Sequence, residues 1–347
     1  MQTGVFHTTY GTDMGLRPTP LSKLRLALFA AGVILFPFWA SPYALTLANQ
    51  IAIATVGAIG LNILVGYTGQ ISLGQGAFMA IGAYGAGLMT ARLGLPFYLS
   101  IPLASLLTAA AGLVFGLPSL RLKGLYLAIA TLAAQQIVEW TVTHWTALTG
   151  GTEALVIPSP RLFGVRMNSD FNFYWIATGA AALTALATAN LFRSRVGRSF
   201  VAVRDQDIAA SALGVDVYRT KLLAFATSSF FVGMAGALLA HYRAIVTWER
   251  FTLETSIVYL AMIIIGGLGS IHGSFFGAVF MVLLPAAIDT FGRSFQDSLP
   301  ALAGVLPSIQ QGIFGLVVLL FLVLEPEGLA RLWGRVKDAA RVWPFSY

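Results

Sequence analysis

The sequence contains no cysteine and little charge: Asp, Glu, Lys and Arg together make up 10% of its 347 residues. The lack of cysteine excludes a disulfide framework and a thiolate metal site. No G-x-x-x-x-G-K-[ST] phosphate-binding loop occurs in the chain, so any ATP must bind another polypeptide. The histidines show no metal-ligand spacing, and no cluster of His, Asp and Glu lies in the apolar runs. We therefore expect no catalytic residue, metal or cofactor in this chain.

Long apolar runs are what the sequence contains instead. Hydrophobic residues make up 57% of the chain, and the mean hydropathy is +0.79. A soluble domain carries roughly 25% charged residues, and about 20 consecutive apolar residues cross a bilayer. Because an isolated segment in lipid must satisfy its own backbone hydrogen bonds, the runs predict an all-α polytopic membrane protein.

The apolar windows predict about ten transmembrane helices. They lie at about 24–42, 44–65, 72–92, 97–117, 124–144, 171–192, 219–243, 255–268, 272–292 and 302–324. The third is rich in glycine and the eighth is short, so both are candidates for broken or partly re-entrant helices. No extended polar linker interrupts the chain, so we expect residues 1–347 to form one membrane domain.

The basic residues predict the orientation of these helices. With the N-terminus in the cytoplasm, most of the 21 Lys and Arg residues fall on the cytoplasmic side, as the positive-inside rule requires. Both termini are then cytoplasmic. The excess of cytoplasmic Lys and Arg also explains the net charge of +7. The sequence shows no basic stripe with interleaved aromatic residues, the pattern that would indicate nucleic-acid binding.

A short glycine motif occurs twice. The stretches "LNILVGYTGQISLG" (61–74) and "AMIIIGGLGSIHG" (261–273) both contain G-x-x-G-[QS]-I at the end of an apolar run. The match fits either two structural repeats with a substrate path between them or a chance likeness of two glycine-rich helix junctions. Under both interpretations, glycine allows tight turns and close helix contacts. The junction glycines are Gly66, Gly69, Gly74, Gly266, Gly267 and Gly269.

Charge is concentrated in "GRSFVAVRDQDIAASALGVDVYRTKLL" (197–223). Asp205 is a good N-cap and Gly214 a good C-terminal stop. Between them one apolar face is formed by Ile208, Ala209, Ala212 and Leu213. The pattern predicts a two-turn amphipathic helix outside the bilayer. It is either a connector whose charges solvate a loop or a docking helix for a motor subunit.

Five segments, in the same order across about 60–280, closely resemble the permease subunits of branched-chain amino acid ABC importers, the LivM-like kind. They are "GYTGQISLGQGAFMAIGAY", "RLKGLYLAIATLA", "LTGGTEAL", "GRSFVAVRDQDIAASALGVDVYRTKLLAF" and "GGLGSIHGSFFGAV". The resemblance implies a fold like that of the ribose and cobalamin importer permeases, in the inner membrane of a prokaryote. It also implies a second permease subunit, two cytoplasmic ATPases that carry ATP and Mg, and an extracytoplasmic substrate-binding protein.

The resemblance makes residues 193–220 a cytoplasmic coupling loop. The E-A-A-x-x-x-G pattern of importers fits at Ala209, Ala210 and Gly214, although Ile208 stands at the acidic position. The residues expected to couple to the ATPase are Arg204, Asp205, Asp207, Ile208, Ala209, Ala210, Leu213 and Gly214.

A few polar residues inside the predicted spans are candidates for the translocation path. Glu139 is the one acid placed well inside a span, and an intramembrane carboxylate is a functional hypothesis by default because burying its charge is costly. Gln135 and Gln136 lie at i−4 and i−3 from it. Glu139 could instead lie near the outer surface, and Asn62 could hydrogen-bond a neighbouring helix instead of a ligand.

The resemblance implies half of an ATP-driven uptake path for branched-chain or related amino acids. Closely similar permeases for urea, short amides or aromatic acids are the alternative. An ATP-independent secondary transporter is the more distant one.

Overall fold

The computed structural model describes residues 20–119, 122, 124–162, 165–296, 306–325 and 328–342. The chain divides into two compact units, Met1–Thr46 and Leu47–Tyr347. The first contains α2 (Pro20–Trp39) and the first residues of α3 (Pro42–Thr68). There the Ser41 hydroxyl accepts a hydrogen bond from the Ala44 amide at 3.3 Å, as an N-cap residue does.

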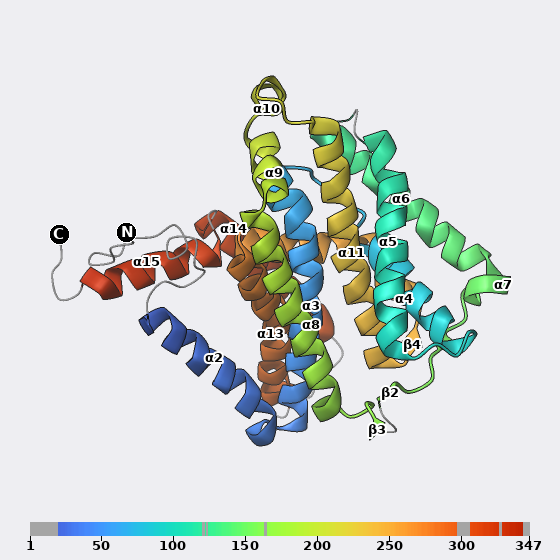
Figure 1. The fold of residues 1–347 in the computed structure, drawn as a ribbon. Coiled ribbons are helices and arrows are strands. Elements are labelled where there is room, and N and C mark those ends of the chain that lie inside the picture. Colours follow the sequence, from blue (N-terminus) through green and yellow to red (C-terminus); the bar gives the residue numbers. More distant parts are fainter. Residues whose placement is uncertain are drawn as a thin grey trace. The chain divides into compact units, whose positions relative to one another are not determined.

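The second unit contains the rest of α3 and the remaining elements (Figure 1). The helices are α4 (Gln75–Ala91), α5 (Phe97–Ser119), α6 (Leu125–His144), α7 (Thr146–Thr149), α8 (Asp170–Arg193), α9 (Arg195–Asp205), α10 (Asp207–Ala212), α11 (Val217–Arg243), the 3-10 helix η1 (Trp248–Phe251), α12 (Leu253–Gly266), α13 (Ile271–Gln296), α14 (Leu306–Leu324) and α15 (Leu329–Val342). Short antiparallel pairs join β1 (Leu155–Val156) to β4 (Ile245–Val246) and β2 (Arg161–Leu162) to β3 (Val165–Arg166).

Six described helices are long and apolar enough to cross a membrane. They are α3, α6, α8 and α11, together with Phe97–Leu117 of α5 and Ile271–Thr290 of α13. Shorter apolar helices lie at Ala27–Trp39, Leu253–Gly266 and Gln311–Phe321. An all-α polytopic membrane protein is therefore confirmed, whereas the number of ten spans stays a prediction. The predicted span 72–92 is the 17-residue helix α4, and the first residues of 302–324 lie outside the described part.

Helix α3 forms the centre of the second unit. Its residues 52–64 are all buried. An added Cβ at Gly57 would meet Tyr259 of α12, and one at Gly60 would meet Val232 of α11. Because α3 has neighbours all round, its sequence has no polar face.

Helices α4, α5 and α11 approach one another through small residues. A Cβ added at Gly82 of α4 would overlap the Gly233 carbonyl of α11, and one at Gly233 would overlap the Thr108 side chain of α5. One at Gly236 of α11 would overlap the Met79 carbonyl of α4. Without a hydrophobic driving force in lipid, such close backbone contact is a main source of helix association.

We expect Gly236→Ala to destabilise the folded chain by about 1–3 kcal/mol, because overpacking a tight contact forces helices apart. Gly179 of α8 has no neighbouring atom within 4 Å of its ideal Cβ position, so Gly179→Ala is the matched control. Thermal unfolding in detergent, followed by size-exclusion chromatography, compares the two variants. Equal unfolding temperatures would contradict the close approach of α4 and α11.

Candidate functional site

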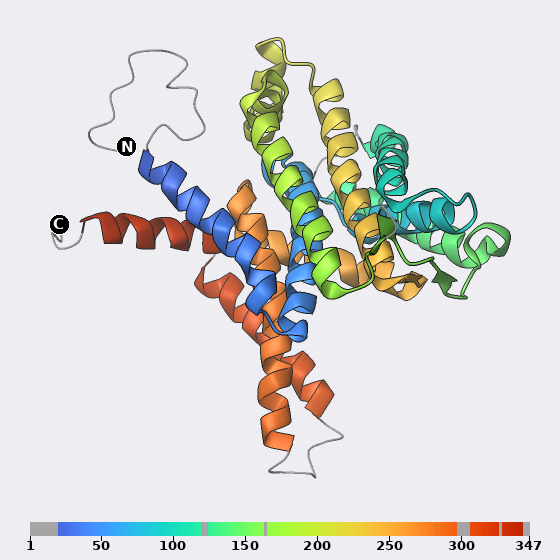
Figure 2. The same cartoon turned by 60° about the horizontal axis from the view of Figure 1, so that its bottom comes forward.

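Helices α9 and α10 lie at the end of the second unit where α8 ends and α11 begins (Figures 1 and 2). We call this end the α10 end. Both glycine junctions lie here, one after α3 and one between α12 and α13. Gly69 has a φ of 67° and Gly269 a φ of 70°, in the left-handed region that favours glycine. The two sequence copies therefore share a left-handed glycine, although the second copy has another at Gly267, with a φ of 118°.

Asn62 joins the two junctions. Its Nδ2 donates to the Ser270 carbonyl at 2.9 Å and to the Ser274 hydroxyl at 2.8 Å. Its Oδ1 accepts from the Gly269 amide at 2.9 Å. A Cβ at Gly66 would overlap Asn62 Oδ1, so only glycine leaves room for this bridge. With both donors and its oxygen engaged, the buried amide fits the helix-to-helix role that the sequence left open.

Arg204 reaches the same junctions from α9. Its Nη1 donates to the Gly66 carbonyl at 3.2 Å, and its Nε and Nη2 donate to Asp205 Oδ1 at 3.0 and 2.9 Å. The ideal Cβ position of Gly69 is 3.2 Å from Arg204 Cγ, and that of Gly269 is 3.3 Å from Arg204 Nη1. One side chain next to α10 thus contacts both junctions.

The predicted amphipathic helix is present as α10, but its predicted N-cap is wrong. Gln206 occupies the N-cap position without a side-chain cap bond. Asp205 instead ends α9 and pairs with Arg204, because the neighbouring guanidinium is a stronger partner for its carboxylate than a backbone amide.

The predicted C-terminal stop is confirmed. Gly214 has a φ of 85°, and its amide donates to the Ser211 carbonyl at 3.0 Å. The Val215 amide donates to the Ala210 carbonyl, also at 3.0 Å. These are the two bonds of a Schellman motif, in which a left-handed glycine ends a helix.

The predicted apolar face of α10 points away from the chain. Leu213 is 85% exposed and Ile208 71%, and Ala209 and Ala212 are exposed as well. Ala210, in contrast, is buried and faces the chain's own interior. The chain itself therefore leaves the apolar side of this short helix uncovered.

Two contacts anchor the segment that carries α10. Lys221 Nζ of α11 lies 3.7 Å from Asp207 Oδ2, and both side chains are largely buried. Asp216 accepts a hydrogen bond from the Arg219 amide at 3.0 Å and so caps α11. The start of α10 is therefore tied to α11, and the chain passes from α10 into a capped α11.

Sequence reasoning missed α9, which carries Arg204. Ser194 accepts a hydrogen bond from the Gly197 amide at 3.3 Å and caps this helix. Gly197, Phe200 and Val203 are buried, a spacing of three that the sequence displays. Ser194 followed by this apolar row is the signal that could have found α9.

A cavity of about 270 Å³ lies beside these residues. Its walls come from the end of α3, the start of α6, the α9–α10 connection and the start of α11. Its charged lining residues are Arg204, Asp205, Asp207 and Lys221, two cations and two anions. The charged residues of the predicted coupling segment thus line a cavity next to the junction at Gly69.

Gln135 holds the start of α4. Its Oε1 accepts from the Ala77 amide, and its Nε2 donates to the Phe251 carbonyl at 2.6 Å. Ser256 Oγ accepts from the Gly76 amide at 2.9 Å. These acceptors satisfy first-turn amides that have no partner within the helix, which lets α4 begin inside the protein.

The start of α4 lies deep between the other helices. Gln75 Nε2 donates to the Gly57 carbonyl at 3.2 Å, and Gly57 stands about 16 Å before the end of α3 at 1.5 Å per residue. The connection from α3 therefore runs as non-helical backbone from the α10 end into the bundle. Gly74, the last of the junction glycines along it, faces the Thr131 carbonyl of α6. Irregular backbone at such depth is tolerated only where protein or water surrounds it.

The four residues predicted for the translocation path do not come together. Asn62 belongs to the α10 end, whereas Glu139 lies near the other end of α6, partly exposed. Gln136 is exposed and Gln135 fully buried. Among the described residues, the Glu139 side chain makes no hydrogen bond or ion pair, including with Gln135 and Gln136. The role of these residues in a path stays a prediction.

Comparison with known proteins gives the family. A family model described as "Branched-chain amino acid transport system / permease component" matches residues 43–322. The chain belongs to this family. The permease is 33% identical to the high-affinity branched-chain amino acid transport system permease protein LivM of Salmonella typhimurium, over 90% of this chain and 75% of that protein.

Other relatives of the permease carry different names. It is 26% identical to the probable branched-chain amino acid transport permease protein LivH of Methanocaldococcus jannaschii, over 69% of this chain and 79% of that protein. It is 29% identical to the fructose import permease protein FrcC of Rhizobium meliloti, over 80% of this chain and 79% of that protein. No solved structure matches the chain.

We expect Asn62→Leu to destabilise the permease by about 1–3 kcal/mol, because it leaves the partly buried Gly269 amide without its acceptor and the buried Ser274 hydroxyl without its donor. Asn190→Leu, at an exposed position of α8, is the matched control. Thermal unfolding of the purified variants measures the difference. If Asn62→Leu unfolds at the wild-type temperature, the bridge between the junctions does not hold them together.

Proposed function

We propose that this permease is one subunit of an ATP-driven importer and forms half of the path for branched-chain or related amino acids. The observation that carries the proposal is the exposed apolar face of α10, held on a segment that reaches both glycine junctions. A separate ATPase covering Ile208 and Leu213 would explain why this face is bare. ATP and Mg would then bind the two ATPase subunits.

The charges support a cytoplasmic α10 end. The segment 193–221 carries Arg193, Arg195, Arg198, Arg204, Arg219 and Lys221. The opposite end of the unit carries Arg92, Arg161, Arg166, Arg243 and Arg250. Helix α15, which begins against the α12–α13 junction at the α10 end, adds Arg331, Arg335 and Lys337 to the first group. An excess of basic residues favours the cytoplasmic side, where an ATPase finds ATP. Arg17, Arg121 and Lys123, which the sequence also assigns to that side, lie outside the described residues.

The contacts suggest how motion would pass from the ATPase to the path. Movement of α10 acts on α11 through Asp207 and Lys221, and on both junctions through Arg204. Each junction ends one helix and starts another, so a shift there changes the tilt of α3, α4, α12 and α13 together. Alternating access then follows as hinge motion at a few glycines.

Names of relatives support the substrate class and the partners. Relatives named for branched-chain amino acid transport reach 33% identity, and LivM and LivH proteins both occur in Methanocaldococcus jannaschii. We therefore infer two different permease chains, two ATPases and an external binding protein in the inner membrane, with both termini of this chain cytoplasmic. Urea, short amides and aromatic acids are the alternative substrates, which binding assays on the external protein would distinguish.

We expect Leu213→Asp to weaken association with the ATPase at least about tenfold, since a buried leucine contributes roughly 1.5–3 kcal/mol. Val196→Asp is the control, because Val196 is also an exposed apolar residue but lies on α9. Co-purification of the ATPase with each variant at rising salt measures association. Full retention by Leu213→Asp would remove α10 as the docking surface. Transport by the chain alone in liposomes, driven by an ion gradient without ATP, would favour a secondary transporter.

We expect Arg204→Gln to keep the ATPase bound and to lower substrate uptake per ATP hydrolysed several-fold. A glutamine cannot reach Asp205 and the Gly66 carbonyl with a rigid charged fork. Arg198→Gln is the matched control, because Arg198 lies on the same helix and donates to the Arg193 carbonyl at 2.9 Å. Uptake and ATP hydrolysis are measured on the same proteoliposomes. An unchanged ratio would show that Arg204 does not transmit motion.

A further inference from the structure

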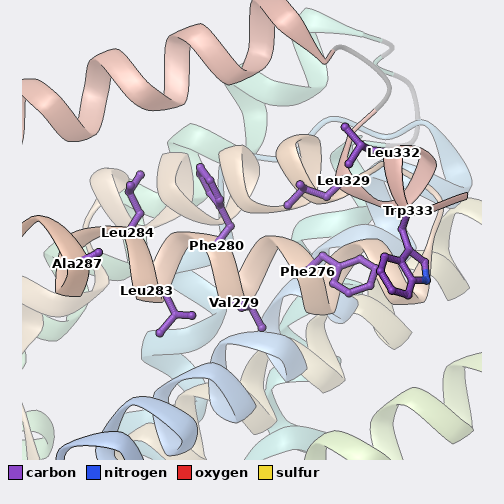
Figure 3. A pocket seen from close by; sticks show the side chains of 9 residues that line it. All are labelled: Phe276, Val279, Phe280, Leu283, Leu284, Ala287, Leu329, Leu332 and Trp333. Atoms are coloured by element: carbon purple, nitrogen blue, oxygen red, sulfur yellow. The ribbon is translucent and has the colours of Figure 1, made fainter. Parts of the chain in front are cut away.

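An apolar groove of about 420 Å³ lies between α13 and α15. All its lining side chains are hydrophobic. Figure 3 shows Trp333 of α15 next to Phe276 of α13 at one end of the groove and Ala287 of α13 toward the other; the rings of Phe276 and Trp333 have centroids 6.1 Å apart. A groove without polar groups does not hold ordered water, so its occupant should be apolar.

Helix α15 is amphipathic and basic. Leu329, Leu332, Trp333 and Val336 recur at the i, i+3, i+4, i+7 spacing of one helix face. Trp333 is 60% exposed and Val336 52%, so the apolar face extends beyond the groove. The other positions carry Arg331, Arg335, Lys337 and Asp338. Such a helix with an aromatic residue on its apolar face is typical of the membrane interface.

The cations of α15 differ in their partners. Arg335 pairs with Glu325, just after α14, at 3.2 Å. Lys337 is exposed and forms no ion pair with any described residue. It stands one turn after Trp333 and beside Val336, at the border of the apolar face. A lysine at such a border extends its ammonium group toward the lipid headgroups.

The start of α15 is fixed at the α10 end. Gly328 has a φ of 80°, and its ideal Cβ position lies 2.7 Å from Gly267 Cα. The helix therefore begins against the α12–α13 junction that Asn62 holds. Because α12 and α13 meet at this level, we place the start of α15 where acyl chains meet headgroups. From there the groove follows α13 from Phe276 to Ala287, about 16 Å at 1.5 Å per residue.

We propose that the groove between α13 and α15 binds one acyl chain of an anionic phospholipid, whose phosphate pairs with Lys337. The apolar lining of the groove fits the acyl chain, and the basic residues of α15 fit the negative headgroup. The bound lipid would hold α15, and through Gly328 the glycine junction, against the membrane surface. The proposal needs only the membrane location of the chain and is independent of its substrate.

Lipid retention tests the proposal. The purified complex is incubated with equal amounts of phosphatidylglycerol and phosphatidylcholine, washed with mild detergent and analysed by native mass spectrometry. We expect the wild type to retain phosphatidylglycerol preferentially. Lys337→Gln should lower this preference about fivefold, which corresponds to about 1 kcal/mol for one cation near an anionic surface. Arg195→Gln removes an exposed cation of α9 and should not change it.

A second variant tests the binding of the acyl chain separately from the binding of the headgroup. Ala287 is exposed at the groove, so Ala287→Phe should fill the space and reduce the retention of both lipids without harming the fold. Ala187→Phe, at an exposed position of α8, is its control. Equal retention of the two lipids by the wild type, or retention that neither Lys337→Gln nor Ala287→Phe changes, would overturn the proposal. So would an imaged complex in which a protein helix occupies the groove.

Discussion

The bridge made by Asn62 is the interaction on which the rest of the arrangement depends. One buried amide contacts Gly269, Ser270 and Ser274, and it can do so only because Gly66 has no side chain to occupy the same space. The junctions consequently lie close enough for a single arginine to contact both. Without this bridge, Arg204 would still reach the Gly66 carbonyl, but no side chain of α3 would hold the second junction beside the first.

This arrangement gives a physical reason for the many small residues of the chain. The α10 end is held by directional hydrogen bonds, whereas α4, α5 and α11 meet through glycine, serine and threonine. Contacts between backbones are close but carry few interlocking side chains, so helices joined in this way can shift without unpacking bulky groups. A rigid connection at one end and smooth contacts farther along suit a path that must open and close.

The sequence predicted those features that depend on interactions between residues close together in the chain. Apolar runs predicted membrane helices, and Gly214 predicted the end of α10, because each depends on neighbours in the chain. The repeated glycine motif predicted junctions, although it did not show that they touch. Asp205 was misassigned because its real partner is the guanidinium of Arg204 and not the first turn of α10. The role of Gln135 was out of reach, since its partners Ala77 and Phe251 lie far away in the sequence.

We propose that a separate ATPase covers the exposed face of α10, and accessibility of Leu213 tests this most directly. Because the chain contains no cysteine, Leu213→Cys provides a single labelling site for a membrane-impermeant maleimide. Labelling rates are measured in sealed vesicles of both orientations, with and without the ATPase. We expect labelling from the cytoplasmic side alone, at a rate that falls when the ATPase binds. Labelling from the outer side, or a rate that the ATPase does not change, would contradict it.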